Sequence, residues 1–494
     1  MGENNELENA HYNDNFVVDN LDGCIISVAP MLDVTNIHFR TLCRIISKYT
    51  ELWTEMIVSD TIIHCYKDES RRNLLEDVYL RTNDYENPLV LQLGGSDPEK
   101  IKNSILIAHK YGFKKYNINV GCPSTKVASD GNFGASLFKY PFRVARIVNE
   151  ANLTLMKLGI NTKLSIKTRI GVDEFDSYKH LFNFISIVSG KNMSNLKKNE
   201  FLNIFPDDIY NDNELINYDD NNYLGADSFI IHSRKAWLNG INPSKNRRIP
   251  KLNYSWVYRL TVDFPELNFY LNGGISSINQ AISILNGSWF VNGSEYIKIN
   301  NNNYNSNHEI DINKKIKLEY DNNDNNNGQS TSDCNCVDDD LENNYYRTKI
   351  KKLINEGKWN KIKGVMIGRE VMNNPFITLS NVDKLIYNKK VDDCITRGYV
   401  LNKYIDYLKE IKPKNKDNVF TIGELNVYLK PVFGIFYGLS GTKRWRKILN
   451  DNIQNVKLEA NKYKKPHHIL EESIELFKKD YSSLLDIPSS EYLK

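Results

Sequence analysis

The sequence lacks the long apolar runs, the paired cysteines and the excess of one charge that would assign it to a special class of protein. No run of about 18 apolar residues occurs in the 494-residue chain, which argues against a transmembrane helix. Seven cysteines, odd in number and scattered, argue against a disulfide scaffold and for a reducing compartment. Lys plus Arg number 64 and Asp plus Glu 61, so the net charge of +3 says nothing about a nucleic-acid partner.

Targeting signals are also absent from the N-terminal sequence. Residues 1–21 contain neither the apolar core of a signal peptide nor an Arg-rich amphipathic pattern. Gly2 is not followed by the Ser or Thr that a myristoylation motif requires. We therefore expect residues 1–21 to be a disordered tail and the protein to be cytoplasmic.

Two internal segments are too polar to bury a core of their own. Residues 191–225 contain nine Asn, and residues 291–346 contain 16. Such segments do not offset the entropy of ordering, and surface loops tolerate them at little cost, so we predict two solvated, low-complexity insertions. Cys334 and Cys336 lie in the second one, but their C-x-C spacing is poor for zinc and no pair of histidines accompanies them. We therefore expect no metal site.

Outside these segments, short apolar runs alternate with helical patterns. The eight runs that we interpret as strands are 24–29, 52–56, 89–93, 116–120, 164–168, 228–232, 269–272 and 364–367. The predicted helices between them are 35–48, 70–80, 98–111, 141–158, 177–189, 254–263 and 277–285. Eight strand–helix alternations predict an α/β fold, a (β/α)8 TIM barrel over residues 22–385. The main alternative is a doubly wound sheet, but no G-x-G-x-x-G follows the first strand to support a Rossmann nicotinamide site.

The pattern changes after residue 385, where no further strand is predicted. Helices are predicted over 395–411, 422–437, 443–458 and 467–485, which indicates a separate all-helical domain over residues 386–494. Residues 401–470 carry 14 Lys and Arg against six Asp and Glu. Residues 443–447 (KRWRK) place a Trp among four cations, which suits phosphates beside a stacking platform. A basic domain of this kind is either a nucleic-acid-binding surface or simply solvated.

Polar residues gather where the predicted strands end, which in this fold is where chemistry occurs. These residues are Gln92, Asn119, Lys167, Arg169, His232 and Asn272. Glycine-rich turns follow the last two strands, at Gly273-Gly274 and Gly368-Arg369, and offer backbone N–H groups and a guanidinium to a phosphate. A phosphorylated cofactor fits this arrangement. Lys167 is placed to offset negative charge on a reduced flavin ring, and Gln92 to bond its amide edge.

Cys122 is the one thiol at these strand ends, within a Gly-Cys-Pro turn. A cysteine in such a place is a nucleophile, a metal ligand, an acid or a bystander. An unperturbed thiol is mostly protonated near neutral pH and can donate its proton to a developing carbanion. A thiol acid beside a hydride-donating cofactor suits the saturation of an activated C=C bond.

Several segments together resemble the tRNA-dihydrouridine synthases of the A-type branch. They include APMLDVTNIHFR (29–40), PLVLQLGGSDP (88–98), NINVGCPSTKV (117–127), FIIHSRKAWLNGINPSKNRRIP (229–250) and GVMIGREVMNNP (364–375). The resemblance implies an FMN-binding barrel followed by a helical tRNA-binding domain. It also implies reduction of D-loop uridines at tRNA positions 20 and 20a: hydride passes from reduced FMN to C6, a cysteine protonates C5, and NADPH reduces the flavin again.

The resemblance also implies roles for individual residues. Cys122 takes the role of general acid, and Asn119 and Arg169 would hold the polar edge of the target base. The FMN-binding roles fall on Pro30, Met31, Leu32, Gln92, Lys167, His232, Asn272, Gly273, Gly274, Gly368 and Arg369. The candidates for tRNA contacts are Lys126, Arg234, Lys235, Lys443 and Arg446.

Two alternatives remain open from the sequence. An FMN barrel that reduces a free pyrimidine or another small enone would not need the basic helical domain. A non-enzymatic RNA-binding protein on a retired barrel would not need Cys122, Lys167 and both glycine turns, which are all present.

Overall fold

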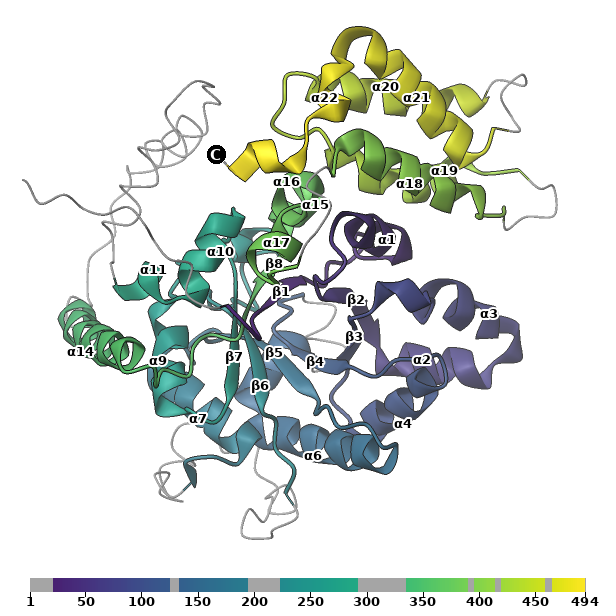
Figure 1. Cartoon of the computed structure of the whole chain (residues 1–494). Coiled ribbons are helices and arrows are strands. Elements are labelled where there is room, and N and C mark those ends of the chain that lie inside the picture. The colour runs from purple at the N-terminus through teal and green to yellow at the C-terminus, as the bar shows by residue number, and fades with distance from the viewer. Residues whose placement is uncertain are drawn as a thin grey trace, which may run out of the picture.

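Eight parallel strands form a barrel in the computed structural model, which describes residues 21–124, 133–193, 223–291, 335–389, 395–413, 419–457 and 464–493 (Figure 1). The strands are β1 (Ile25–Val28), β2 (Leu52–Val58), β3 (Leu89–Gly94), β4 (Tyr116–Val120), β5 (Ser165–Arg169), β6 (Ser228–His232), β7 (Asn268–Asn272) and β8 (Gly364–Ile367). Their order is β1-β8-β7-β6-β5-β4-β3-β2. Hydrogen bonds of 2.9 Å from Val28 N to Glu51 O and from Glu51 N to Ile26 O join the two remaining edges. The predicted (β/α)8 barrel is confirmed.

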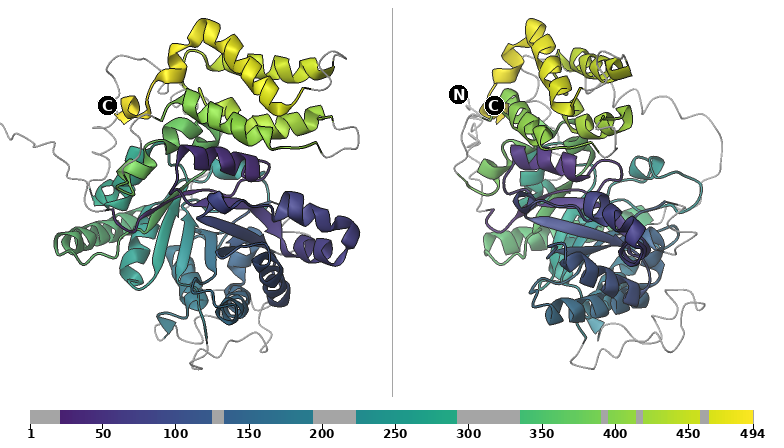
Figure 2. Two further views of the ribbon diagram at one scale, coloured as in Figure 1. Left: turned by 45° about the vertical axis from the view of Figure 1, so that its right-hand side comes forward. Right: turned by 90° about the vertical axis from the view of Figure 1, so that its right-hand side faces the viewer.

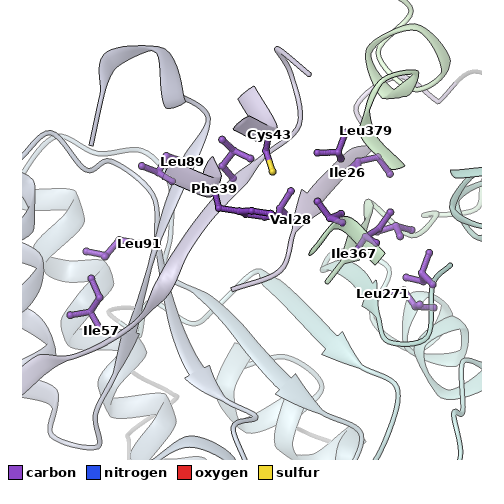
Figure 3. Close-up of a cluster of buried hydrophobic side chains, with 14 of the residues drawn as sticks. Ile26, Val28, Phe39, Cys43, Ile57, Leu89, Leu91, Leu271, Ile367 and Leu379 are labelled. Carbon is purple, nitrogen blue, oxygen red and sulfur yellow. The ribbon is translucent and has the colours of Figure 1, made fainter. Parts of the chain in front are cut away.

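Each strand has side chains on an inner and an outer face, and both faces are largely buried. The outer face packs against the surrounding helices. Figure 3 shows part of this layer, with Ile26, Val28 and Ile367 of the strands near Phe39 and Cys43 of the first helix. The inner face has its own apolar cluster, made of Ala29, Trp53, Val90, Ile230 and Met366. Burial on both faces explains why the strands stand out as short apolar runs in the sequence.

Helices cover the outside of the barrel between successive strands. The main ones are α1 (Ile37–Ile46), α2 (Ser59–Lys67), α4 (Pro98–His109), α6 (Pro141–Lys157), α7 (Tyr178–Ser189), α9 (Ser255–Asp263) and α10 (Ile278–Leu285). Shorter ones are α3 (Arg72–Leu74), α11 (Ser288–Val291), α15 (Arg369–Asn373), α16 (Pro375–Leu379) and α17 (Val382–Leu385). Asp97 and Ser177 cap α4 and α7 by accepting backbone N–H groups, as polar residues before a helix predict.

Residues 69–79 are helical, close to the predicted 70–80, but they divide into the 3-10 turn η1 (Glu69–Arg71), the α-helical turn α3 and the π-helical turn η2 (Leu75–Tyr79). The prediction missed α2, the longer helix between β2 and β3. In residues 69–79, Leu74 and Val78 are 42% and 53% exposed, so the apolar residues there do not form one buried stripe. α2 buries Ile62 and Cys65, but it follows β2 without a loop, and the sequence shows no boundary there.

Part of the second predicted insertion is an ordered helix, which corrects that prediction. α14 (Asn335–Asn355) begins inside the 291–346 segment. It packs on α9 through polar contacts: Tyr346 OH donates to Asp263 Oδ1 at 2.9 Å, and Arg259 pairs with Glu342 at 2.8 Å. Tyr346, Ile350 and Ile354 lie on one face of α14 and pack against the core, but this apolar stripe is short and follows a polar tract. The predictions for residues 1–20, 194–222 and 292–334 and for the side chains of the C-x-C pair lie outside the described residues.

The C-terminal region is all-helical, as predicted, and lies beside α1 in both views of Figure 2. Its helices are α18 (Arg397–Lys409), α19 (Ile422–Leu429), α20 (Thr442–Gln454), α21 (Pro466–Tyr481) and α22 (Ser483–Asp486). Tyr407 OH lies 2.7 Å from His38 Nδ1, and Lys430 Nζ donates to Asp33 O at 2.6 Å, so polar contacts tie this region to the barrel. The boundary at residue 386 stays a prediction. Within the described ranges, no helix has the length and apolar character needed to cross a membrane.

Candidate active site

The strand register brings the predicted polar residues together at one end of the barrel. Asn119 pairs with Lys167 across β4 and β5, and Arg169 with His232 across β5 and β6. His232 in turn pairs with Asn272 on β7. Because adjacent positions in a parallel sheet point the same way, these side chains converge at the C-terminal ends of the strands. The barrel mouth therefore holds the residues that the sequence selected one strand at a time.

A relay of amides orients the turn that carries Cys122. Gln92 Nε2 donates to Asn117 Oδ1, and Asn119 Nδ2 donates to Gln92 Oε1, each at 2.9 Å. Asn119 Oδ1 then accepts the backbone N–H groups of Gly121 at 3.0 Å and Cys122 at 2.9 Å. The two amide–amide links are buried, where an unpaired polar group is costly, and the two bonds to the backbone of the turn are partly buried. The relay fixes the position of the cysteine relative to strands β3 and β4.

Cys122 is the partly exposed thiol among the four described cysteines, since Cys24, Cys43 and Cys65 are buried. Its carbonyl accepts the N–H of Ala135 at 2.9 Å, at the start of η4 (Gly134–Lys139). The side chain interacts electrostatically with Lys167 and Arg169. A reactive group at the mouth is thus open to a substrate and surrounded by positive charge. Lys126 lies outside the described residues.

Four cations surround His232. Burial lowers the pKa of His232 well below its ordinary value, and the charges of Lys167, Arg169, Arg234 and Arg369 lower it further. Burial and the charge of Arg169 likewise lower the pKa of Lys167 to about 8. His232 Nδ1 is buried and has no hydrogen-bond partner among the described residues. Concentrated positive charge and an unsatisfied polar atom are what an anionic ligand would compensate.

The glycine turns bring backbone close to this cluster. Gly273 and Gly274 have φ values of +112° and +69°, which side chains disfavour. A Cβ at Gly273 would lie 3.2 Å from His232 Nε2, and one at Gly274 would lie 2.4 Å from Leu252 Cδ1. Tyr254 OH donates to Gly273 O and fixes the turn. Asn272 Nδ2 is held by Met366 O at 2.8 Å, which couples the turn to β8.

The third part of the mouth is the turn after β1. Thr35 Oγ1 accepts the N–H of Met31 at 3.0 Å, and Met31 O accepts the N–H of Val34 at 3.1 Å. Pro30 and Met31 are half-buried, whereas Leu32 is 76% exposed. Gly368 approaches this turn, since a Cβ there would lie 3.3 Å from Ala29 Cβ. The first and last strands thus meet in one closely packed corner.

Arg169 has a structural role that the sequence did not reveal. Its Nε donates to Gly121 O at 2.9 Å, and its Nη1 donates to Lys235 O at 3.0 Å and Asn246 O at 3.2 Å. One guanidinium therefore joins the loops after β4 and β6. Only its Nη2 has no hydrogen bond within the described part of the chain. The signal in the sequence was a charged residue at a strand end, which does not distinguish a loop clamp from a ligand contact.

The predicted tRNA-contact residues differ in how far they are engaged within the protein. Arg234 donates to Arg248 O at 3.3 Å and Lys235 pairs with Asp176. Lys443 is exposed on α20, and Arg446 is half-buried with Nε donating to Phe433 O at 3.3 Å. Arg369, which the resemblance assigns to FMN rather than to tRNA, donates from Nη2 to Arg247 O at 3.3 Å.

The expectation that the Trp of residues 443–447 is a stacking platform was wrong. Trp445 is fully buried, and its Nε1 donates to Val432 O at 2.9 Å. It packs edge-on against Phe436 and Phe477, with ring centroids 5.0 and 5.4 Å away. The helical period puts Trp445 on the same inner face as Ile448 and Leu449, so this tryptophan serves the core.

These features define a class of protein: a (β/α)8 barrel whose catalytic mouth combines a partly exposed thiol with a cationic, glycine-lined pocket rim. Comparison with known proteins agrees with this class. The chain matches the dihydrouridine synthase (Dus) family over residues 27–196 and 210–289. It is 30% identical over 426 residues to the tRNA-dihydrouridine(20/20a) synthase of Shewanella oneidensis, covering 86% of this chain and 88% of that protein.

Two further relatives are also named tRNA-dihydrouridine(20/20a) synthases. The protein of Escherichia coli K12 is 29% identical over 435 residues, 88% of each chain. The protein of Vibrio parahaemolyticus is 38% identical over 258 residues, which are 52% of this chain and 64% of that protein. The chain belongs to the dihydrouridine synthase family.

Proposed function

We propose that this protein reduces D-loop uridines of tRNA, at positions 20 and 20a, to 5,6-dihydrouridine with FMN as cofactor and NADPH as reductant. The observation that carries the proposal is the convergence of Cys122 with the cationic mouth in a chain of this family. The names of the relatives supply the substrate and the two positions. NADPH rests on the family resemblance alone.

The residues at the mouth fit a flavin mononucleotide. The unsatisfied Nδ1 of His232, the close-packed turns at Gly273-Gly274 and Gly368, and the guanidinium of Arg369 suit its phosphate and polar tail. Lys167 would meet the electron-rich edge of the ring, and Gln92, Asn272 and the turn of Pro30, Met31 and Leu32 would line it. When bound, FMN would supply the hydride that adds to C6 of the uridine.

Cys122 would complete the reduction by giving its proton to C5. The amide of Asn119 holds the turn of this thiol in place, so the S–H is positioned before the substrate arrives. Loss of the proton leaves a thiolate, with the cationic groups of Lys167 and Arg169 close to it.

The target base would be held on its polar edge by Asn119 and by Nη2 of Arg169. A uridine within folded tRNA must first be turned out of its stack, at a cost of a few kcal/mol. Phosphate contacts from Lys443 and Arg446 on the helical region and from Arg234 and Lys235 on the barrel would offset this cost. The barrel would thus reduce the base while the helical region helps to select it.

The test is a single-turnover assay with Cys122→Ala. The variant should retain its yellow flavin and its affinity for tRNA, but reduction of unmodified tRNA by the prereduced protein should slow by about 10²- to 10⁴-fold, the usual contribution of a general acid. Cys65→Ala, which removes a buried thiol from α2, is the matched control and should react normally.

Three outcomes would overturn parts of the proposal. An unchanged rate in Cys122→Ala would remove this thiol from the mechanism. A colourless protein that refuses added FMN would remove the cofactor. Equal reduction of free uridine and of tRNA would indicate a reductase of small pyrimidines instead, and faster flavin reduction by NADH than by NADPH would correct the reductant.

A further inference from the structure

The loop after β6, residues 234–251, is fastened to the barrel mouth at several points. Arg169 binds the carbonyls of both Lys235 and Asn246, so its guanidinium joins the two sides of the loop. Ala236 N donates to Gly171 O at 2.9 Å, and Asp173 N donates to Ala236 O at 2.8 Å, which extends the contact with β5 beyond the strand end. The loop is therefore a fixed part of the mouth.

Trp237 stands on this loop in one defined position. The backbone N–H of Trp237 donates to Asn246 Oδ1, and Asn246 Nδ2 donates to the backbone carbonyl of Trp237, both at 2.8 Å. Asn246 is itself fully buried. Leu238 N donates to Asp173 Oδ1 at 2.9 Å on the other side. The backbone that carries the indole is held on both sides of the residue.

The indole of Trp237 is nevertheless 38% exposed. All six tryptophans of the chain are described, and the other five are buried or partly buried in apolar clusters. Lys235 Nζ lies 4.0 Å from the Trp237 ring centroid and covers part of the ring. An indole that is more than a third exposed, on a backbone held on both sides, presents a flat apolar surface with a polar N–H, which is why tryptophan is enriched at binding surfaces.

The segment that carries Trp237 is strongly basic, although two carboxylates of the loop after β5 contact it: Asp176 pairs with Lys235, and Asp173 accepts the N–H of Leu238. Residues 234–251 contain six Lys and Arg and no Asp or Glu. Arg247 and Lys245 flank the asparagine that holds Trp237, and both are exposed, as are Arg248 and Lys251. An aromatic ring among cations suits a nucleobase joined to phosphates, because the ring stacks on the base while the cations meet the backbone.

We propose that Trp237 is a stacking platform for an unpaired nucleobase of the tRNA substrate, and that the cations of residues 234–251 bind the phosphates on either side. The inference rests on the proposed function and adds the residue that meets a second base outside the catalytic pocket. It relocates to the barrel the stacking platform that the sequence placed on the helical region. Arg169 binds both the turn that carries Cys122 and the loop that carries Trp237. A base stacked on Trp237 would therefore set the position of the RNA relative to Cys122.

The experiment compares Trp237→Ala and Trp237→Phe with the wild-type protein, all loaded with FMN, using an unmodified tRNA transcript. Trp237→Ala should raise the Kd for tRNA about 5- to 100-fold, the range for loss of one stacked base. Trp237→Phe keeps an aromatic ring and should stay within about 5-fold of the wild type. Neither change removes a charge, so the slope of log Kd against log salt should not change.

A second measurement does not depend on the alanine variant folding. Binding of tRNA should quench part of the tryptophan fluorescence of the wild type, and this part should vanish in Trp237→Phe. The matched control is Tyr345→Ala on α14, because Tyr345 is also an exposed aromatic (58%) with a lysine, Lys349, 5.6 Å from its ring centroid. Its Kd for tRNA should equal that of the wild type.

The outcomes separate this inference from the proposed function. If the wild type reduces tRNA while Trp237→Ala binds it equally well, or if the quenching persists in Trp237→Phe, the stacking role is refuted and the proposed function stands. If Tyr345→Ala weakens binding as much as Trp237→Ala does, the effect is not specific and the inference also fails. If the wild type neither binds nor reduces tRNA, both proposals fall together.

Discussion

Replacing Lys167 with methionine should stabilise the flavin-free protein while weakening its hold on FMN. The side chain of Lys167 projects into the barrel mouth without a carboxylate partner among the described residues. Of the neighbouring charges, that of Arg169 has the largest effect on the pKa of Lys167. Methionine keeps most of the apolar stem of lysine and removes the charge. The expected gain in stability is therefore the electrostatic cost of the ammonium group.

The magnitude follows from the pKa of Lys167, which burial and Arg169 lower from 10.5 to about 8. A shift of this size corresponds to about 3 kcal/mol between the two protonation states. Lys167 retains some contact with solvent, which screens part of this cost, so we expect Lys167→Met to raise the free energy of unfolding by about 2 kcal/mol at pH 7.

The pH dependence gives this prediction a sign. Below about pH 8 Lys167 is charged in both the folded and the unfolded chain, so the whole cost is present. Between about pH 8 and 10.5 the folded state has released the proton and the unfolded state still holds it, so the wild type gains stability with rising pH. The advantage of Lys167→Met should therefore be greatest below pH 8 and shrink as the pH approaches 10.5.

The assay is urea denaturation of flavin-free wild type, Lys167→Met and Lys163→Met at several pH values from 7 to 10. Lys163→Met is the control, because Lys163 is exposed just before the same strand and should change stability by less than about 0.5 kcal/mol. FMN titration of the same proteins should show weaker binding for Lys167→Met alone. A destabilised Lys167→Met protein, or an advantage that grows with pH, would refute the electrostatic reasoning.

Two further predictions concern the glycine turn and the buried tryptophan. Gly274→Ala should cost about 1–3 kcal/mol of stability and lower the flavin content, because φ is +69° and the new Cβ meets Leu252. Adding Leu252→Ala should relieve the steric clash but not the strain of the positive φ. Urea denaturation and the bound-flavin absorbance measure the two effects. Trp445→Ala should lower the stability of the helical region by about 3–5 kcal/mol in thermal unfolding, whereas Lys443→Ala should leave the melting temperature unchanged and raise KM for tRNA. A stable Trp445→Ala protein that loses only tRNA affinity would reinstate the stacking role there.

The local sequence predicted an element correctly where its buried residues follow a regular pattern. β4, β6 and β8 begin and end where the predicted strands do, because strands buried on both faces are mostly apolar, although β4 also buries Asn117 and Asn119. It was a poor guide to α2 and to the start of α14. α2 has no loop before it, and α14 begins in a polar tract, with its core-facing residues Tyr346, Ile350 and Ile354 only in its second half.

The sequence by itself determined the barrel, the helical region and the ring of polar strand ends. The alternation of strand and helix patterns and the residue types at strand ends both depend on neighbouring residues in the chain. Only the tertiary structure decided what each polar or aromatic side chain does there. Arg169 clamps two loops, Trp445 is core, and Trp237 is the exposed indole, because hydrogen-bond partners and burial depend on residues far apart in the chain. A tryptophan among cations has the same local pattern whether its ring faces the core or the solvent, and packing alone chooses between them.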